Sequence, residues 1–187
     1  MGNRLTKITT RTGDFGTTGL GDGSRLQKNA VRIAAMGDLD ELNSMLGLVL
    51  SESLPDFARA TLSRIQNELF DLGGEICIPD HAVLTNAHVE FLDTELSRLN
   101  ADLLPLKEFI LPGGSRAGSC CHLARTVARR AERTLVGLAQ SESVSALALQ
   151  YLNRLSDFLF ILARALNRDA GVADVCWQRV PAPHEAD

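Results

Sequence analysis

The sequence has no run of apolar residues close to the roughly 20 that a membrane-spanning helix needs, and we expect neither a secretory leader nor a transit segment before the loop at Thr10. It also lacks the cysteine spacing of a zinc site or a disulfide framework, because its four cysteines form no C-x-x-C pair. We therefore expect a soluble cytoplasmic protein with reduced thiols, no metal ion held by protein side chains and no membrane association.

A surplus of positive charge is absent as well. The 19 Lys and Arg residues are outnumbered by 23 Asp and Glu residues, which gives a net charge of −4 and a pI near 5.6. Nonspecific binding to nucleic acid depends on such a surplus, so a nucleic-acid partner is not expected. The length of 187 residues and the 45% hydrophobic content suit one globular domain with a substantial core. A positively charged site must therefore arise from arginines that are concentrated locally.

Two common phosphate-binding fingerprints are missing: no glycine pattern ends in Gly-Lys-Ser/Thr, and no G-x-G-x-x-G follows a predicted strand. Two other stretches are present. The loop 10–19, TRTGDFGTTG, offers many unhindered backbone N–H groups and hydroxyls, and the run 125–133, RTVARRAER, concentrates guanidinium groups whose fork geometry suits phosphate oxygens. Together they predict a nucleotide site that binds a triphosphate.

Hydrophobic periodicity predicts an all-α fold, a five-helix bundle with short loops. Asp38 with Glu41 three residues later has the spacing of a capping box, the pair Gly73 and Gly74 is expected to end the second helix, and Gly171 to end the fifth. The expected helices cover residues 38–51, 56–72, 88–103, 119–139 and 144–169. The chain is then a single domain, with an irregular N-terminal arm at 1–37, the bundle at 38–171 and a tail at 172–187.

The predicted fourth helix has two unlike faces. Its core stripe repeats at helical spacing and comprises Ala124, Val127, Ala128, Ala131, Leu135 and Leu138. The other side gathers His122, Arg125, Arg129, Glu132 and Arg133. Arg125 and Arg129 are like charges four residues apart, which costs a helix roughly 0.2–0.5 kcal/mol, so we expect an anion or an acid from elsewhere between them. The alternative is a solvated arginine face in which Glu132 pairs with Arg129.

The predicted fifth helix carries Asn153 and Asp157 as helical neighbours in an apolar sequence. Burial of an amide and a carboxylate is costly unless both are hydrogen-bonded or paired, so we expect arginines of the fourth helix as their partners. Asp157 then has a structural role, as a pair that fixes helix register, and Asn153 has a ligand role. Asp40, an acid early in the first helix, could pair with Arg125 within or between subunits.

With these motifs in order, the chain resembles the PduO-type ATP:cob(I)alamin adenosyltransferases from Ile8 through Trp177. The segments that carry the resemblance are TRTGD at 10–14, DELN at 40–43, FILPGG at 109–114, RRAER at 129–133 and NRLSD at 153–157. The resemblance implies a five-helix bundle that forms a homotrimer, with ATP bound between neighbouring subunits. It also implies the reaction, in which cob(I)alamin attacks C5′ of ATP and releases triphosphate to give adenosylcobalamin.

The resemblance further implies roles for individual residues. ATP, with Mg²⁺, would be held by Thr10, Arg11, Thr12, Gly13, Thr17, Thr18, Lys28, Arg129, Glu132, Arg133 and Asn153. Arg129 and Lys28 would stabilise the charge on the departing triphosphate. Phe109 would cover the lower face of the corrin, and the alternative is that Phe109 is a plain core residue. Arg125 would pair with Asp40 across the subunit interface. A cob(II)alamin reductase and an adenosylcobalamin-dependent mutase are candidate partners.

Two other functions suit a helical bundle. A ferritin-like di-iron site needs Glu-x-x-His motifs, and none of the four histidines has Glu three residues before it. A noncatalytic carrier or regulator that binds ATP or a corrinoid is the better alternative, and it predicts ATP binding without release of triphosphate. The absence of a compact Ser/His/Asp or Cys/His constellation fits the adenosyl transfer, because Co(I) is itself a strong nucleophile and needs no general base.

Overall fold

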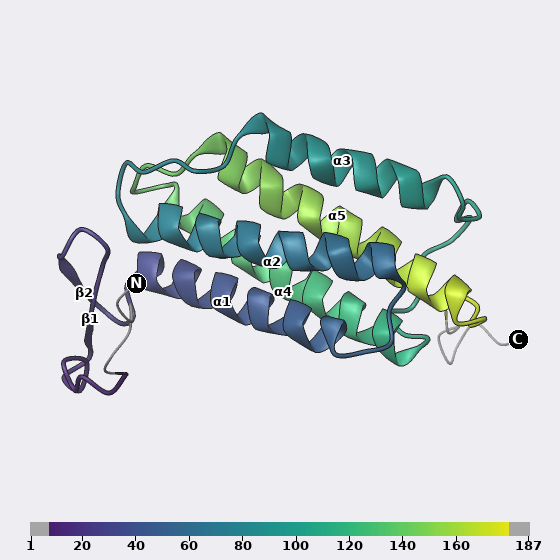
Figure 1. Ribbon diagram of the computed structural model, residues 1–187, viewed down its shortest axis with the longest axis horizontal. Helices are drawn as coiled ribbons and strands as arrows, with labels where there is room; N and C mark the ends of the chain where they lie inside the picture. Colours follow the sequence, from purple (N-terminus) through teal and green to yellow (C-terminus); the bar gives the residue numbers. More distant parts are fainter. Residues whose placement is uncertain (1–7, 180–187) are drawn as a thin grey trace, which may run out of the picture.

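The computed structural model describes residues 8–179, while residues 1–7 of the arm and 180–187 of the tail lie outside the described part. Five helices lie side by side in a bundle, and a small hairpin projects beyond one end of it (Figure 1). The elements are β1 (Thr17–Gly19), β2 (Arg25–Gln27), α1 (Val31–Leu50), α2 (Asp56–Cys77), α3 (Asn86–Asn100), α4 (Arg116–Leu138) and α5 (Ala146–Asp169). The predicted five-helix bundle is confirmed.

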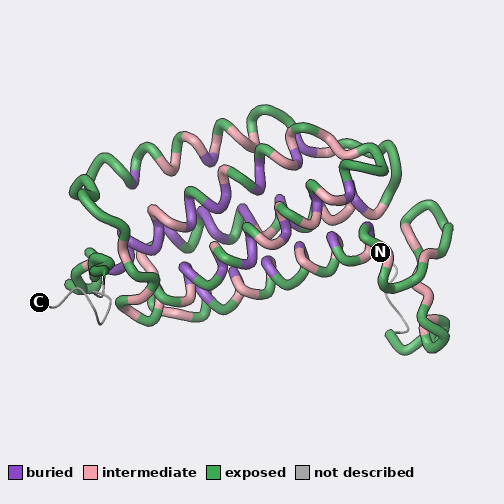
Figure 2. Tube along the Cα trace, turned by 180° about the vertical axis from the view of Figure 1, so that it is seen from behind, coloured by how far each residue is buried: buried purple, intermediate pink, exposed green. Residues whose placement is uncertain are grey.

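Helix α4 lies at the centre of the packing, because it contacts both α1 and α5, while α2 packs on α1 and α3 on α5. All six residues of its predicted core stripe are buried, from Ala124 to Leu138. Figure 2 shows the buried positions of the helices turned toward one another inside the bundle, with exposed positions outside. Three of the six are alanines, whose small side chains let neighbouring helices approach closely.

Helix α1 begins at Val31, earlier than the capping box at Asp38 predicts, and Ala30 occupies the N-cap without a side-chain bond. The prediction was wrong because an acid and a second acid three residues later fit a helix face as well as a cap. The early start is stabilised by Arg32, which is buried, donates to the Ile76 carbonyl at 2.5 Å and pairs with Glu142 at 2.6 Å. The first helix therefore includes residues that the sequence assigns to the arm.

Helix α2 continues through Gly73 and Gly74 to Cys77, so the predicted end at the glycines was wrong. The residues that follow them have strong tertiary contacts: Ile76 is in the core, and the buried Glu75 accepts the Val83 and Leu84 N–H groups and the Ser145 hydroxyl. These contacts outweigh the cost of about 1 kcal/mol for each glycine inside a helix. At the end of α5, Gly171 has φ 68°, as expected of a helix stop.

The N-terminal arm contains an antiparallel hairpin that the sequence did not predict, in which Thr18 pairs with Leu26. The hairpin meets the bundle at the end of α2, where the Gly21 N–H donates to the Cys77 carbonyl at 3.1 Å. The arm otherwise extends away from the helices (Figure 1). Within residues 8–179, no helix is long and apolar enough to cross a membrane.

We expect Tyr151→Phe to lower the free energy of unfolding by about 1–3 kcal/mol, the usual cost of an unsatisfied buried polar group. Tyr151 is fully buried, and its hydroxyl donates to Glu68 at 2.8 Å. The other Glu68 oxygen accepts from Arg64 at 2.6 Å. Burial, followed by the Glu68 charge, raises the pKa of Tyr151 and keeps its proton in place as a donor. Urea denaturation measures the effect, with Glu68→Gln as a control that keeps an acceptor. A variant as stable as the parent protein would contradict the expectation.

Candidate functional site

Four of the predicted nucleotide-binding residues gather where α4 faces α5. Arg129, Glu132 and Arg133 line a shallow depression of about 220 Å³ together with Val136. From α5, the Asn153 amide donates to Glu132 at 3.1 Å, and on α4 itself Arg133 donates to the Arg129 carbonyl at 2.9 Å. Both guanidinium groups are on exposed residues, and among the described residues neither pairs with a carboxylate. The predicted pair of Glu132 with Arg129 is not formed, and the two arginines remain available to an anion.

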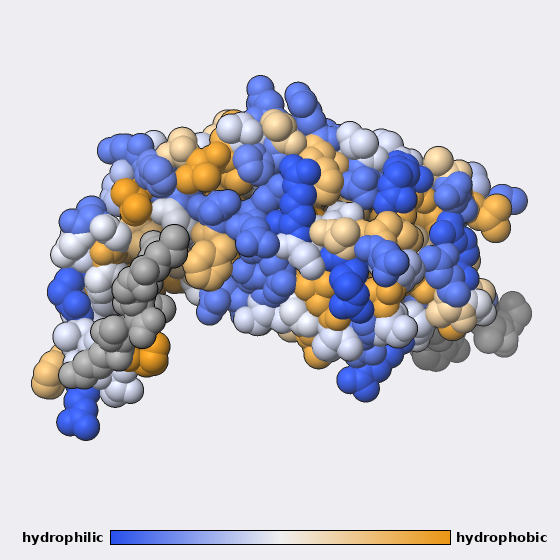
Figure 3. Space-filling model, viewed as in Figure 1, coloured by the Kyte–Doolittle hydropathy of each residue, from blue (hydrophilic) through white to orange (hydrophobic). Residues whose placement is uncertain are grey.

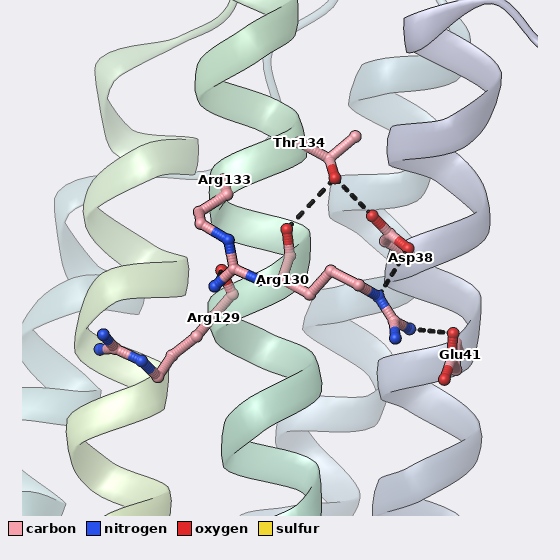
Figure 4. A network of polar contacts seen from close by, with 6 residues as sticks. All are labelled: Asp38, Glu41, Arg129, Arg130, Arg133 and Thr134. Atoms are coloured by element: carbon pink, nitrogen blue, oxygen red, sulfur yellow. Dashed lines mark hydrogen bonds and ion pairs between the residues drawn. The ribbon is translucent and has the colours of Figure 1, made fainter.

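Arg130, between these two arginines in sequence, has a different role. Its Nε pairs with Asp38 at 3.1 Å and its Nη2 pairs with Glu41, while the Thr134 hydroxyl donates to the second Asp38 oxygen at 2.6 Å. Figure 4 shows Arg130 directed toward α1, whereas Arg129 and Arg133 lie on the other side of α4. Asp38 and Glu41, which the sequence assigns to a helix cap, thus connect α1 to α4 through Arg130 and Thr134. This group of four residues is called the Arg130 lock.

One turn earlier on α4, Arg125 lies in a groove of about 620 Å³ with Phe109, Ile110 and Phe160. Arg125 is half-buried, and its Nε is buried and has no hydrogen-bond partner in the part of the chain that the structure describes. Burial, and next the positive charge of Arg129, lowers the pKa of Arg125. The like-charge pair predicted from the sequence is therefore present, and within the described chain no acid neutralises it.

Phe109 is 79% exposed, so the plain core role that the sequence left open for it is wrong. The ring stands on the loop between α3 and α4, beside Arg125 and Phe160 in the same groove. Exposure of a large aromatic side chain next to an apolar ring and a half-buried cation marks a surface suited to a flat, partly apolar ligand.

His122 was assigned from its position to the polar side of α4, but it is buried, with 3% of its surface exposed. Among residues 8–179, neither ring nitrogen has a hydrogen-bond partner, and the ring meets Phe160 edge-on at 6.0 Å between centroids. Burial, and then the Arg125 charge, lowers the pKa of His122. The lowered pKa favours a neutral imidazole next to Phe160, a feature that helical spacing alone could not reveal because Phe160 belongs to α5.

Asn153 and Asp157 are both exposed, so the prediction that they are buried against arginines of the fourth helix was wrong. Asn153 bonds to Glu132 instead, and Asp157 pairs with Arg154 on its own helix at 3.5 Å. Helix α5 is apolar around most of its circumference because it packs on both α3 and α4. Asn153 and Asp157 lie on its exposed side, and apolar neighbours in sequence do not imply burial for them.

The arm brings the other predicted residues together. Gly13 lies close to Lys28: if Gly13 were replaced by another residue, its Cβ would lie 3.1 Å from Lys28 Nζ and the ammonium group would have to shift. The Thr10 and Thr12 hydroxyls lie 3.0 Å apart, next to Arg11, which adopts the left-handed φ of 60°. Thr17 and Thr18 form part of β1, opposite Leu26 and Gln27. The predicted loop and Lys28 thus form one exposed group of hydroxyls, N–H groups and an ammonium.

Arg25 is a residue of the arm that the sequence interpretation missed. Its Nη2 donates to the Thr12 carbonyl at 2.7 Å and to the Thr17 hydroxyl at 2.9 Å. The guanidinium therefore holds the loop 10–19 by two of its residues. In the sequence, Arg25 is marked only by its position two residues after Gly23. Substitution of Arg25 removes both contacts at once.

The two halves of the predicted site are separate in the chain. Among residues 8–179, no hydrogen bond or ion pair joins the arm to α4, and Figure 1 shows the arm extended beyond the end of the bundle. Asp40 is exposed and lines a different groove, of about 550 Å³, with Asn43, Phe70 and Gly73 between α1 and α2. Apolar and charged residues are interspersed over the face that carries α1 and α2 (Figure 3). Asp40 and Arg125 therefore do not pair within the chain.

Residues 8–166 match the family described as cobalamin adenosyltransferase. The chain belongs to this family. It is 59% identical over 180 residues to the cobalamin adenosyltransferase of Cupriavidus metallidurans, covering 96% of this chain and 98% of that protein. It is 46% identical over 180 residues to the corrinoid adenosyltransferase of Bacillus subtilis, covering 92% and 93%. The resemblance found from the sequence motifs is confirmed.

Solved structures of the family have the same fold. A variant of the PduO-type ATP:corrinoid adenosyltransferase from Lactobacillus reuteri, complexed with cobalamin and ATP, superposes with a TM-score of 0.89 at 34% identity. The match covers 92% of this chain and 100% of that chain. A second variant of the same enzyme, complexed with ATP, gives a TM-score of 0.88 at the same identity over 91% of this chain.

Proposed function

We propose that this chain transfers the 5′-deoxyadenosyl group of ATP to cob(I)alamin and releases triphosphate. The observation that carries the proposal is the pair of exposed arginines on α4, Arg129 and Arg133, which lie outside the Arg130 lock and beside Glu132 and Asn153. The relatives match over nearly their full lengths and are described as adenosyltransferases, which supports catalysis over a noncatalytic carrier. The superposed structure that contains cobalamin and ATP supports the same two substrates.

The reaction needs charge stabilisation more than proton transfer. The electron pair of Co(I) forms a bond to C5′ of MgATP, and the bond from C5′ to oxygen breaks with its pair leaving on triphosphate. Negative charge therefore grows on the leaving group, where preorganised cations lower the barrier. In the proposal, Arg129 and Lys28 supply these cations, while Thr10, Thr12 and the backbone at Gly13 hold the phosphates.

We propose further that the working form is a homotrimer in which the arm of one subunit covers the α4 face of its neighbour. The separation of arm and arginines within one chain supports this arrangement, because a single chain leaves the phosphate loop without its arginines. Arg125, whose buried Nε has no acceptor among the described residues, then pairs with Asp40 of the adjacent subunit. The α1–α2 groove that contains Asp40 is the surface that would receive it.

Phe109 has a separate role in the proposal, which is to cover the lower face of the corrin and exclude the axial ligand that stabilises higher oxidation states of cobalt. Its exposure beside Phe160 supports contact with a flat apolar surface. A cytoplasmic cob(II)alamin reductase would supply the electron, and an adenosylcobalamin-dependent mutase would use the product.

We expect Arg129→Ala to lower kcat by about 10²–10³-fold, since removal of one preorganised donor from a developing anion costs about 2.7–4 kcal/mol. The assay is anaerobic formation of adenosylcobalamin and triphosphate from chemically reduced cob(I)alamin and saturating MgATP. Arg59→Ala, which removes an exposed arginine of α2, serves as the matched control and should leave kcat unchanged. Near-normal turnover of Arg129→Ala would refute its role, and ATP binding by the parent protein without triphosphate release would favour the carrier.

The arm should become protected from trypsin when MgATP binds. Arg11 and Lys28 are exposed, and the contact at Gly21 ties their segment only loosely to the bundle. Ordering of this glycine-containing loop is best offset by contacts with the phosphates. Cleavage after Arg179, which is also exposed, is the internal control that nucleotide should not affect. Equal cleavage after Arg11 and Lys28 with and without MgATP would show that the arm does not close over the nucleotide.

Phe109→Ala should slow the reaction far more when cob(II)alamin must be reduced on the protein than when cob(I)alamin is supplied ready-made. The ring acts in the proposal before electron transfer, whereas attack on C5′ depends on the arginine and loop contacts around ATP. The two assays are run side by side with the same protein. An equal loss in both would mean that Phe109 only shapes the loop.

A further inference from the structure

The loop that carries Phe109 is paired with the segment that follows α5. Ile110 and Cys176 form an antiparallel bridge. On one side of it the Leu111 N–H donates to the Val175 carbonyl at 2.8 Å, and on the other the Trp177 N–H donates to the Phe109 carbonyl at 2.7 Å. Residues 174–177, here called the tail strand, therefore form the backbone partner of Phe109 itself.

One buried guanidinium connects the tail strand to the start of the same loop. Arg164 of α5 pairs with Asp174 at 2.7 Å and donates to the Leu104 carbonyl at 2.8 Å. Only 6% of the Arg164 side chain is exposed, so these contacts are shielded from water and from salt. Arg164 thus fixes where the loop leaves α3 and where the tail strand begins.

The far end of the loop is held by a second residue of α5. The buried Asn167 donates to the Gly113 carbonyl at 2.9 Å and accepts the Ser115 N–H at 2.9 Å. Gly114 has φ 105°, and a Cβ at that position would lie 2.3 Å from the Asn167 amide nitrogen. The loop is therefore anchored at both ends by α5, and the tail strand fixes the part between them.

Core packing does not orient the Phe109 side chain, because the ring is 79% exposed. Its direction depends on the backbone at Phe109, and the Phe109 carbonyl is bonded to Trp177. Groups that act on a ligand need placement within about 0.5 Å, and a misplacement of about 1 Å can cost 10²-fold in rate. An exposed ring with a catalytic task thus requires a rigid backbone partner.

We propose that the tail strand, anchored by Arg164 and Asp174, is the positioning element that sets Phe109 against the lower face of the corrin. This inference rests on the proposed function and assigns a role to residues that the five sequence motifs do not include. The tail strand is bonded to the loop on both sides of Ile110, so in this inference it acts through Phe109.

The test is Trp177→Pro, which removes the N–H that bonds to the Phe109 carbonyl. Cys176→Pro is the matched control, because the Cys176 N–H forms no hydrogen bond with any described residue and the bonds on either side of it remain. Trp177→Ala removes the indole and keeps the N–H. The first readout is the absorption spectrum of protein-bound cob(II)alamin, which distinguishes four-coordinate from five-coordinate Co(II). The second is the rate of adenosylcobalamin formation, measured from cob(II)alamin with a reductant and from ready-made cob(I)alamin.

Trp177→Pro should lose most of the four-coordinate signal. Its rate from cob(II)alamin should fall at least tenfold, while its rate from ready-made cob(I)alamin should change little. The same pattern is expected of Phe109→Ala. Cys176→Pro and Trp177→Ala should resemble the parent protein. Should Trp177→Pro not fold, as judged by circular dichroism, Asp174→Asn is measured in its place and should show the same pattern. If Trp177→Pro gives the same spectrum and the same ratio of rates as Cys176→Pro, the role of the tail strand is overturned and the proposed function is not. Absence of product from the parent protein with cob(I)alamin would overturn the proposed function instead.

Discussion

The packing of α4 against both α1 and α5 is the constraint on which the rest of the structure depends. Its stripe of small and aliphatic residues, with Ala124, Ala128 and Ala131 fully or almost fully buried, lets two helices approach from adjacent sides. Once that stripe is buried, the orientation of every other residue on α4 is determined by the 100° step of the helix. Arg125, Arg129 and Arg133 then share one side of the helix, facing α5 and the loop of Phe109.

The consecutive arginines at 129 and 130 show how one helix serves both stability and the site. Arg130 is occupied by Asp38 and Glu41 of α1, and Thr134 shares the Asp38 carboxylate, so this side of α4 cannot rotate without breaking several charged contacts (Figure 4). Arg129 has no such acid among the described residues. The contacts of Arg130 therefore fix how α4 is rotated against α1, and this rotation places Arg129 on the opposite side of the helix.

Much of the fold could be predicted from the sequence, because long amphipathic helices carry a strong periodic signal. The errors have a common cause in tertiary contacts: Glu75 and Ile76 extend α2 past two glycines, and Arg32 starts α1 before the apparent cap. In the candidate site, the family resemblance implied the grouping of Arg129, Glu132, Arg133 and Asn153, which lie together where α4 faces α5. The burial of His122 did not follow from the sequence, since it depends on packing against a neighbouring helix, where the ring meets Phe160, and no local pattern records such packing.

Two buried polar groups lie in surface grooves of the chain. Asn43 Oδ1, in the α1–α2 groove with Asp40, and Arg125 Nε, in the groove with Phe109, are both buried and unbonded among the described residues. Each such group costs about 1–3 kcal/mol unless another molecule supplies its partner. The two grooves lie on different helices and carry opposite charges, an acid in one and a cation in the other. That complementarity is the arrangement expected if a second copy of the chain and the substrates between the copies supply the missing partners.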